Sequence, residues 1–218
     1  MSDSRLREDI CRFARSLFER GLAALPERFE ELQQGVERAL PYAAATGVKR
    51  LHLMAGNADR GDARAAAAYR QAVAWTAERL AAAGLELVLE PINARNMPGY
   101  FLNDFFYAER LIGDLKLPNL KLQFDIYHCQ IVHGDVTMAL RRLMPIIGHV
   151  QVASVPSRHE PMSEELNDAF LFAELDRLGY QGFVGCEYNP RAGTREGLGW
   201  FAPYAAKGEA GQRRDTRA

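Results

Sequence analysis

Oxygen-bearing side chains end several short apolar segments of this 218-residue sequence. Five such segments run over 51–56, 85–90, 120–125, 148–151 and 182–187, and four of them end at Glu90, Asp125, Gln151 and Glu187. If the segments are neighbouring parallel strands of a barrel, their carboxyl ends open onto one mouth and these side chains converge there. Oxygen ligands without thiolates favour Mg²⁺ or Mn²⁺ over zinc. The pattern therefore predicts a divalent-cation site.

Three acids in one pocket need a cation or shared protons, because an unpaired buried carboxylate is costly or takes up a proton. A cation held by three carboxylates and one amide keeps positions for a hydroxycarbonyl substrate, whose carbonyl it polarises. A carboxylate beside it can take a proton from one carbon, and its counterpart can return one to the next. The spacing leaves an alternative open, in which these residues only cap strand ends and bond to loop N–H groups or arginines.

Two further side chains are candidates for holding a substrate. His128 follows Asp125 by three positions, in a loop expected above the same strand end, and can hydrogen-bond a substrate oxygen. Arg158 lies in a long polar loop and can bind a carboxylate bidentately. The alternatives are that His128 packs in its loop and that Arg158 forms a salt bridge with Glu160 or Glu164.

A repeated β/α unit must position these residues. The strand starts are about 28–35 residues apart, and helical patterns cover 26–45, 62–83, 103–113, 134–144 and 167–178. That spacing accommodates one strand and one crossover helix, which predicts an α/β fold with a parallel sheet buried on both faces. His52 and His149, within or beside strands, are expected to be core or surface histidines. Residues 1–18 carry apolar residues at helical spacing, which predicts a short amphipathic helix.

Composition excludes several classes. A net charge of −1 gives no electrostatic signature for nucleic acid or an anionic membrane, and 48% hydrophobic residues suit one main domain. No apolar run approaches the roughly 20 residues that span a bilayer, and no signal peptide is visible. The three cysteines lack CxxC spacing, which disfavours a disulfide framework or structural zinc. A cytoplasmic protein is expected.

Several motifs in order resemble the hydroxypyruvate isomerase family of xylose isomerase-like TIM barrels. They are RGLAALPER, LEPINARNMPGYFL, NLKLQFDIYHCQIVHGD, GHVQVASVPSRHEP, ELN at 165–167 and GFVGCEYNPRAGTREGLGW. The resemblance implies a (β/α)8 fold and interconversion of hydroxypyruvate and 2-hydroxy-3-oxopropanoate (tartronate semialdehyde). It implies four metal ligands, two of which also form the acid/base pair, and two substrate-binding residues. The ligands are Glu90, Asp125, Gln151 and Glu187, the pair is Glu90 and Glu187, and the substrate residues are His128 and Arg158.

The front of the chain departs from that family, whose members have three further β/α units before the stretch matching RGLAALPER. We therefore expect an N-terminally truncated barrel of about five units over 20–206, a non-family segment at 1–19 and a disordered tail at 207–218. Either the chain is a fragment, or a homo-oligomer or the N-terminal helix covers the gap. Weak or absent turnover with retained metal binding is expected. The alternatives are a 2-oxo-tetronate isomerase, a ketose 3-epimerase, or a non-catalytic barrel remnant.

Overall fold

Five parallel strands in consecutive order, joined by helices, make up the part of the chain that the structure describes. The structure is a computed structural model that describes residues 21–205. The predicted helix at 1–18, the segment 1–19 and the tail 207–218 lie outside the described residues. The strands are β1 (Arg50–His52), β2 (Glu86–Leu89), β3 (Leu120–Asp125), β4 (Ile147–Val152) and β5 (Val184–Cys186).

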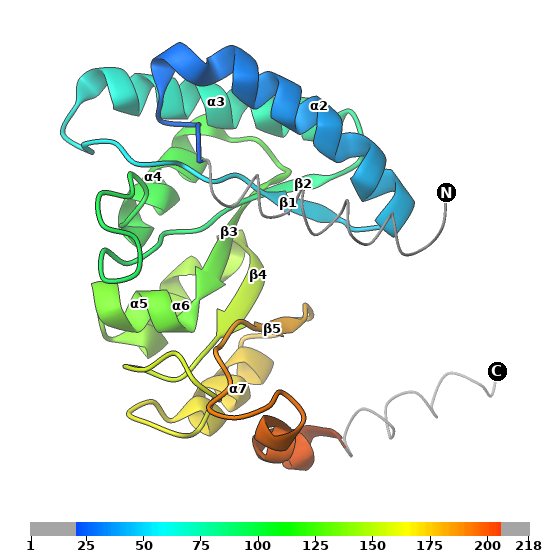
Figure 1. The fold of residues 1–218 in the computed structure, drawn as a ribbon, viewed down its shortest axis with the longest axis vertical. Coiled ribbons are helices and arrows are strands. Elements are labelled where there is room, and N and C mark those ends of the chain that lie inside the picture. The colour runs from blue at the N-terminus through cyan, green and yellow to red at the C-terminus, as the bar shows by residue number, and fades with distance from the viewer. Residues whose placement is uncertain (1–20, 206–218) are drawn as a thin grey trace.

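Among residues 21–205, the helices lie on the convex face of a curved sheet, and none of them covers its concave face (Figure 1). The α-helices are α2 (Phe29–Thr46), α3 (Ala63–Ala81), α4 (Phe105–Leu115), α5 (Ile126–Val132), α6 (Val136–Leu143) and α7 (Asp168–Arg177), with 3₁₀ turns at η1 (Pro26–Arg28), η2 (Met144–Ile146) and η3 (Glu196–Phe201). The repeated β/α unit and the five-unit barrel-type sheet predicted from the sequence are confirmed.

The predicted helices end at the residues that suit helix ends. Gly47 closes α2 in the left-handed conformation at φ 70°, which glycine adopts at little cost. The Asp104 side chain accepts the Phe106 and Tyr107 N–H groups at the start of α4, and Asn167 accepts the Phe170 N–H at the start of α7. These caps satisfy backbone donors that have no partner within the helix.

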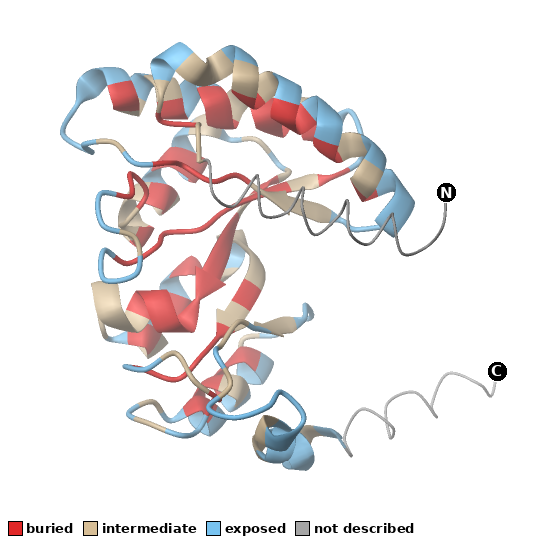
Figure 2. Ribbon diagram, viewed as in Figure 1, coloured by how far each residue is buried: buried red, intermediate tan, exposed pale blue. Residues whose placement is uncertain are grey.

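The prediction that the strands are buried on both faces holds for most of β2 and β3 and is wrong for β1, β4 and β5. On the convex side, Leu87, Leu89, Leu122 and Phe124 are at most 1% exposed, because the helices cover them. The alternate positions Val88, Gln123 and Asp125 are buried as well, at 1%, 7% and 0% exposed. Strands β1 and β5 contain no buried residue and β4 contains only Val150 and Val152 (Figure 2).

The two outer strands are shorter than the sequence pattern suggested. Strand β1 covers three residues where the segment 51–56 was expected, and β5 covers three of 182–187. Each pairs along one side only, β1 with β2 and β5 with β4, so fewer ladder bonds define their ends. Beyond β1 the chain passes close to Gly21, the first described residue. A Cβ on Gly21 would lie 2.3 Å from the Gly56 nitrogen. Only glycine allows this approach.

Two further expectations concern thiols and membranes. Cys129 is buried and Cys186 is exposed, and both are free thiols. Over residues 21–205 there is no helix with the length and apolar character needed to cross a bilayer.

Candidate metal and substrate site

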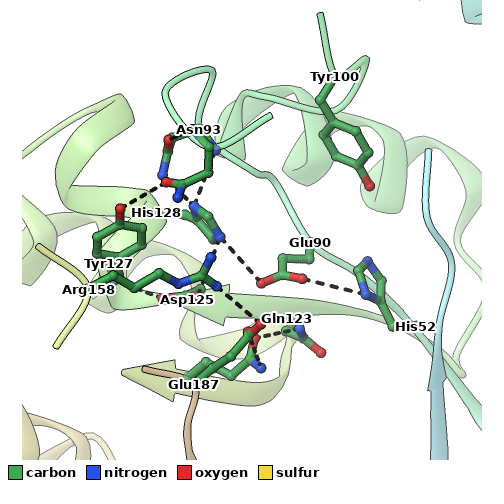
Figure 3. A network of polar contacts seen from close by, with 12 residues as sticks. His52, Glu90, Asn93, Tyr100, Gln123, Asp125, Tyr127, His128, Arg158 and Glu187 are labelled. Atoms are coloured by element: carbon green, nitrogen blue, oxygen red, sulfur yellow. Dashed lines mark hydrogen bonds and ion pairs between the residues drawn. The ribbon is translucent and has the colours of Figure 1, made fainter. Parts of the chain in front are cut away.

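The carboxyl ends of four strands bring the predicted site residues to one edge of the sheet. Asp125 ends β3 and Gln151 lies near the end of β4, whereas Glu90 and Glu187 directly follow β2 and β5. Because the strands are parallel and in consecutive order, the four side chains gather at the same mouth (Figure 3).

Glu90 and Asp125 are the buried acids of this mouth, at 3% and 0% exposed. Burial, with the nearby Glu187 charge as a second cause, raises the pKa of Asp125 to about 7. Burial, followed by the charges of Asp125 and Glu187, holds the pKa of Glu90 well above its usual value. Oε1 of Glu90 and Oδ2 of Asp125 have no hydrogen-bond partner among the described residues. Each of the two buried acids thus keeps one carboxylate oxygen without a hydrogen-bond partner in the described part of the chain.

His128 completes this group, in a place that differs from the predicted loop. Strand β3 ends at Asp125, and α5 begins at once, because Asp125 Oδ1 accepts the Tyr127 N–H at 2.8 Å and so caps the helix. The first turn of α5 therefore carries His128, whose Nε2 lies 3.7 Å from Asp125 Oδ2 and 4.0 Å from Glu90 Oε1. Burial lowers the pKa of His128 to about 3, so the ring is neutral.

The group fits a metal ion. Glu90, Asp125 and His128 each offer a ligand atom, and these atoms all lie within 4.8 Å of one another. The unpartnered oxygens, Oε1 of Glu90 and Oδ2 of Asp125, face His128 Nε2 at 4.0 and 3.7 Å, and a cation would neutralise both acids. By distance these three described residues can hold a metal ion, and His128 is a ligand only where its Nε2 carries no proton.

Gln151 and Arg158 both contact Glu187 and form a second group with it. Figure 3 shows Arg158 and Glu187 beside Asp125. Gln151 donates to Glu187 Oε2 at 2.9 Å and accepts from Gln123 at 2.6 Å. Arg158 Nη2 lies 3.1 Å from Glu187 Oε1, and its guanidinium lies 5.1 Å from the centre of the Tyr127 ring. Arg158 therefore belongs to the site, and the alternative of an ion pair with Glu160 or Glu164 is wrong.

Two residues of the site escaped the sequence analysis. His52 was expected to have no role, yet its Nδ1 lies 3.5 Å from Glu90 Oε2. In β1, His52 follows Leu51, whose side chain faces outward, and successive side chains of a strand point to opposite faces. This alternation could have indicated that His52 faces the mouth. Asn93 follows Glu90 by three residues and contacts the His128 ring from the next loop. Nothing in the spacing of the sequence reveals that contact.

The stability of the metal-free chain is expected to fall as the pH rises from 6.5 to 8.5. Folded Asp125 and Glu90 hold protons that the unfolded chain releases near pH 4, so their contribution is lost as the pH rises through their folded pKa values. The pKa values of His52 and His128 are lowered to about 4 and about 3, so these two rings make the stability rise with pH. Their effect ends at about pH 6.5, where the histidines of the unfolded chain have lost their protons. Urea midpoints in the presence of a chelator measure the difference.

Two controls accompany this measurement. Glu90→Gln removes one of the two titrating acids and should flatten the pH dependence. Saturating Mg²⁺ should raise the midpoint at pH 8.5 more than at pH 6.5, since it competes with protons for the same oxygens. Equal midpoints for the metal-free chain at both pH values would show that the acids are not buried as described.

Comparison with known proteins agrees with this architecture. Residues 7–204 match the family described as xylose isomerase-like TIM barrel. A 2-oxo-tetronate isomerase of Cupriavidus necator is 51% identical over 191 residues, 87% of this chain and 74% of the relative. A hydroxypyruvate isomerase of Escherichia coli is 38% identical over 85% of this chain and 73% of its own length. The matched range begins inside the segment 1–19, so the domain boundary at residue 20 stays a prediction.

A solved structure supports the same assignment. A Brucella melitensis protein described as AP endonuclease, family 2, is 44% identical, with a TM-score of 0.82 over 85% of this chain and 72% of that one. Sequence and fold agree over most of the described residues. The chain belongs to the xylose isomerase-like TIM barrel family.

Proposed function

We propose that this chain is a metal-dependent isomerase that interconverts hydroxypyruvate and 2-hydroxy-3-oxopropanoate by moving a proton between neighbouring carbons. The observation that carries the proposal is the pair of buried acids, Glu90 and Asp125, whose free oxygens face a neutral histidine at the strand ends. Isomerases of small hydroxy-oxo acids among the relatives support the reaction class. A cytoplasmic location and a homo-oligomer are part of the proposal.

The metal in this proposal is Mg²⁺ or Mn²⁺, with Glu90, Asp125, Gln151 and Glu187 as its ligands. Their donor set consists of oxygens, which suits either ion. When bound, such an ion polarises the substrate carbonyl and acidifies the neighbouring C–H. In the metal-free arrangement Gln151 and Glu187 are bonded to each other and to Gln123 and Arg158, so they must exchange those contacts for the ion.

Proton transfer falls to Glu90 and Glu187. They follow β2 and β5, and strands β3 and β4 lie between these two in the sheet. Glu90 and Glu187 can therefore approach a bound substrate from two directions. One carboxylate takes the proton from the hydroxyl-bearing carbon, which gives an enediolate, and the other, in its protonated form, gives a proton to the neighbouring carbon. The hydroxyl proton moves to the former carbonyl oxygen, so the atoms and charges of substrate and product balance. Burial of Glu90 excludes water from its side of the site.

Arg158 and His128 hold the substrate. The Arg158 guanidinium is kept in place by Glu187 and the face of Tyr127, and its remaining N–H groups suit a bidentate pair with a substrate carboxylate. His128 faces the mouth with Nε2 and can bond a substrate oxygen.

Arg158→Gln is expected to raise KM for hydroxypyruvate about 10- to 100-fold, because a charge-assisted pair to an anionic ligand contributes about 1.5–3 kcal/mol. The matched control is Arg191→Gln, which removes another loop arginine, paired with Glu164 at 3.3 Å, and should leave KM unchanged. Steady-state kinetics of both variants measure this. Equal KM for the Arg158 variant and the parent would remove Arg158 from the substrate site.

A 2-oxo-tetronate is the second candidate substrate, favoured by the 51% identical relative. Comparing kcat/KM for hydroxypyruvate, a 2-oxo-tetronate and a free ketose such as D-fructose tests the assignment. We expect activity with an oxo acid and none with the ketose. Activity with the ketose alone would instead indicate a 3-epimerase, and no metal-dependent activity with any of them would favour a non-catalytic remnant.

A further inference from the structure

The His128 ring is held from behind by a single residue. Nδ1 of His128 lies 2.6 Å from Asn93 Nδ2 and 3.3 Å from the Asn93 backbone nitrogen. A backbone N–H can only donate, so Nδ1 must accept and carries no proton. Both residues are at most 1% exposed, and water does not compete for these bonds.

The orientation of the Asn93 amide is itself fixed. Its Oδ1 accepts the Asn96 N–H at 2.9 Å, which turns Nδ2 toward the ring. The Asn96 side chain in turn accepts the Tyr127 O–H at 2.8 Å. A rotated amide would place Oδ1 against Nδ1 and lose both bonds. The polar contacts behind His128 therefore all agree on one arrangement (Figure 3).

The proton of the neutral ring must then lie on Nε2. That atom faces the mouth, 3.7 Å from Asp125 Oδ2 and 4.0 Å from Glu90 Oε1. A protonated Nε2 is a hydrogen-bond donor and offers no lone pair to a cation. The carboxylate oxygens therefore remain available as metal ligands, and the His128 ring remains a hydrogen-bond donor.

We propose that Asn93 is a positioning residue, which fixes His128 in the Nε2–H form so that the ring donates to a substrate oxygen and stays outside the metal coordination. The part that concerns substrate rests on the proposed function. The part that concerns the ring proton and the metal does not, because it follows from the hydrogen bonds of the chain alone.

The direct test is the protonation of the His128 ring nitrogens in the ¹⁵N-histidine-labelled full chain. Long-range ¹H–¹⁵N correlation spectra distinguish protonated from unprotonated ring nitrogens, and His128→Gln assigns the signals. We expect a protonated Nε2 and an unprotonated Nδ1, both without metal and with saturating Mg²⁺. A proton on Nδ1, or loss of the Nε2 proton when Mg²⁺ is added, would overturn the proposal. Neither result depends on turnover.

Variants of Asn93 separate positioning from a merely structural role. Asn93→Asp offers Nδ1 a carboxylate that only accepts, so Nδ1 should become protonated and kcat should fall about 100-fold or more, in line with the cost of a wrong tautomer in other histidine sites. Asn93→Ala keeps the backbone donor, so the ring should stay in the Nε2–H form, but it loses the amide that fixes the ring and should lower kcat/KM about tenfold. The control is Asn103→Asp, the same chemical change at a residue that accepts from Arg60. It should alter neither the protonation of the His128 ring nor the kinetic constants.

The outcomes distinguish the two proposals. A ring that keeps its Nε2 proton in folded Asn93→Asp, or kinetics of Asn93→Ala equal to those of the parent, would show that the Asn93 side chain does not position the ring. If the parent has the expected ring form but no isomerase activity, the proposed function fails and the positioning by Asn93 stands. If Asn93→Asp does not fold, the spectrum of the parent still decides the ring form.

Discussion

Glu90→Gln is expected to lower kcat/KM for hydroxypyruvate by about 10²- to 10⁴-fold, the range that a positioned acid or base contributes to proton transfer. The change keeps the shape of a side chain that is 3% exposed but removes the proton-accepting oxygen. It also removes a buried acid whose pKa is held well above its usual value, so the metal-free fold should be no less stable. Steady-state kinetics and urea unfolding together separate lost chemistry from lost structure.

The control for Glu90→Gln lies in β2, the strand that Glu90 follows. Glu86→Gln makes the same chemical change in β2, where Glu86 pairs with Arg50 at 3.1 Å near the start of the strand. We expect it to leave kcat/KM within about twofold, because surface ion pairs contribute roughly 0–1 kcal/mol to stability and this one is outside the site. Equal activity of Glu90→Gln and the parent would exclude Glu90 as an acid or base.

Asp125→Asn is expected to weaken Mn²⁺ binding by more than about 100-fold, since the loss of residues that only support metal ligands already costs 10- to 100-fold. Asparagine is as good a helix N-cap as aspartate, so the bond from Oδ1 to the Tyr127 N–H and the start of α5 should survive. Calorimetric titration with Mn²⁺ measures the affinity, and circular dichroism shows whether the helix content is kept.

Asp104→Asn is the matched control for this variant. Asp104 also caps a helix, α4, through the Phe106 and Tyr107 N–H groups, and pairs with Arg60 at 3.1 Å outside the acid pair. The same change there should not alter Mn²⁺ affinity. Unchanged affinity in Asp125→Asn, or an equal loss in both variants, would argue against Asp125 as a ligand.

The positions of the acids could be predicted from the sequence because a parallel sheet converts sequence order into spatial order. Glu90 and Asp125 each follow an apolar segment that is buried under helices, so their place at the mouth depends only on where that segment stops. Helix ends were predictable for a similar reason, since Asp104 and Gly47 act on backbone groups within one turn of themselves. Local chemistry determines both features.

The contacts between loops could not be predicted in this way. Asn93 and His128 are 35 residues apart, and their bond depends on α5 starting directly after Asp125. That start arises because Asp125 serves as strand end and helix cap at once, which removes the loop expected around His128. The partial exposure of the outer strands β1 and β5 also escaped prediction, since the sequence segments 51–56 and 182–187 are mostly apolar.

The measurement that tests the central proposal most directly is deuterium incorporation into hydroxypyruvate and its product in D₂O, followed by NMR with the full chain and Mg²⁺ or Mn²⁺. Exchange at carbon detects proton transfer even where net turnover is slow on an open sheet. The account predicts metal-dependent incorporation that Glu90→Gln abolishes and Glu86→Gln does not. Absence of metal-dependent incorporation by the folded, metal-bound chain, or equal incorporation by Glu90→Gln, would contradict it.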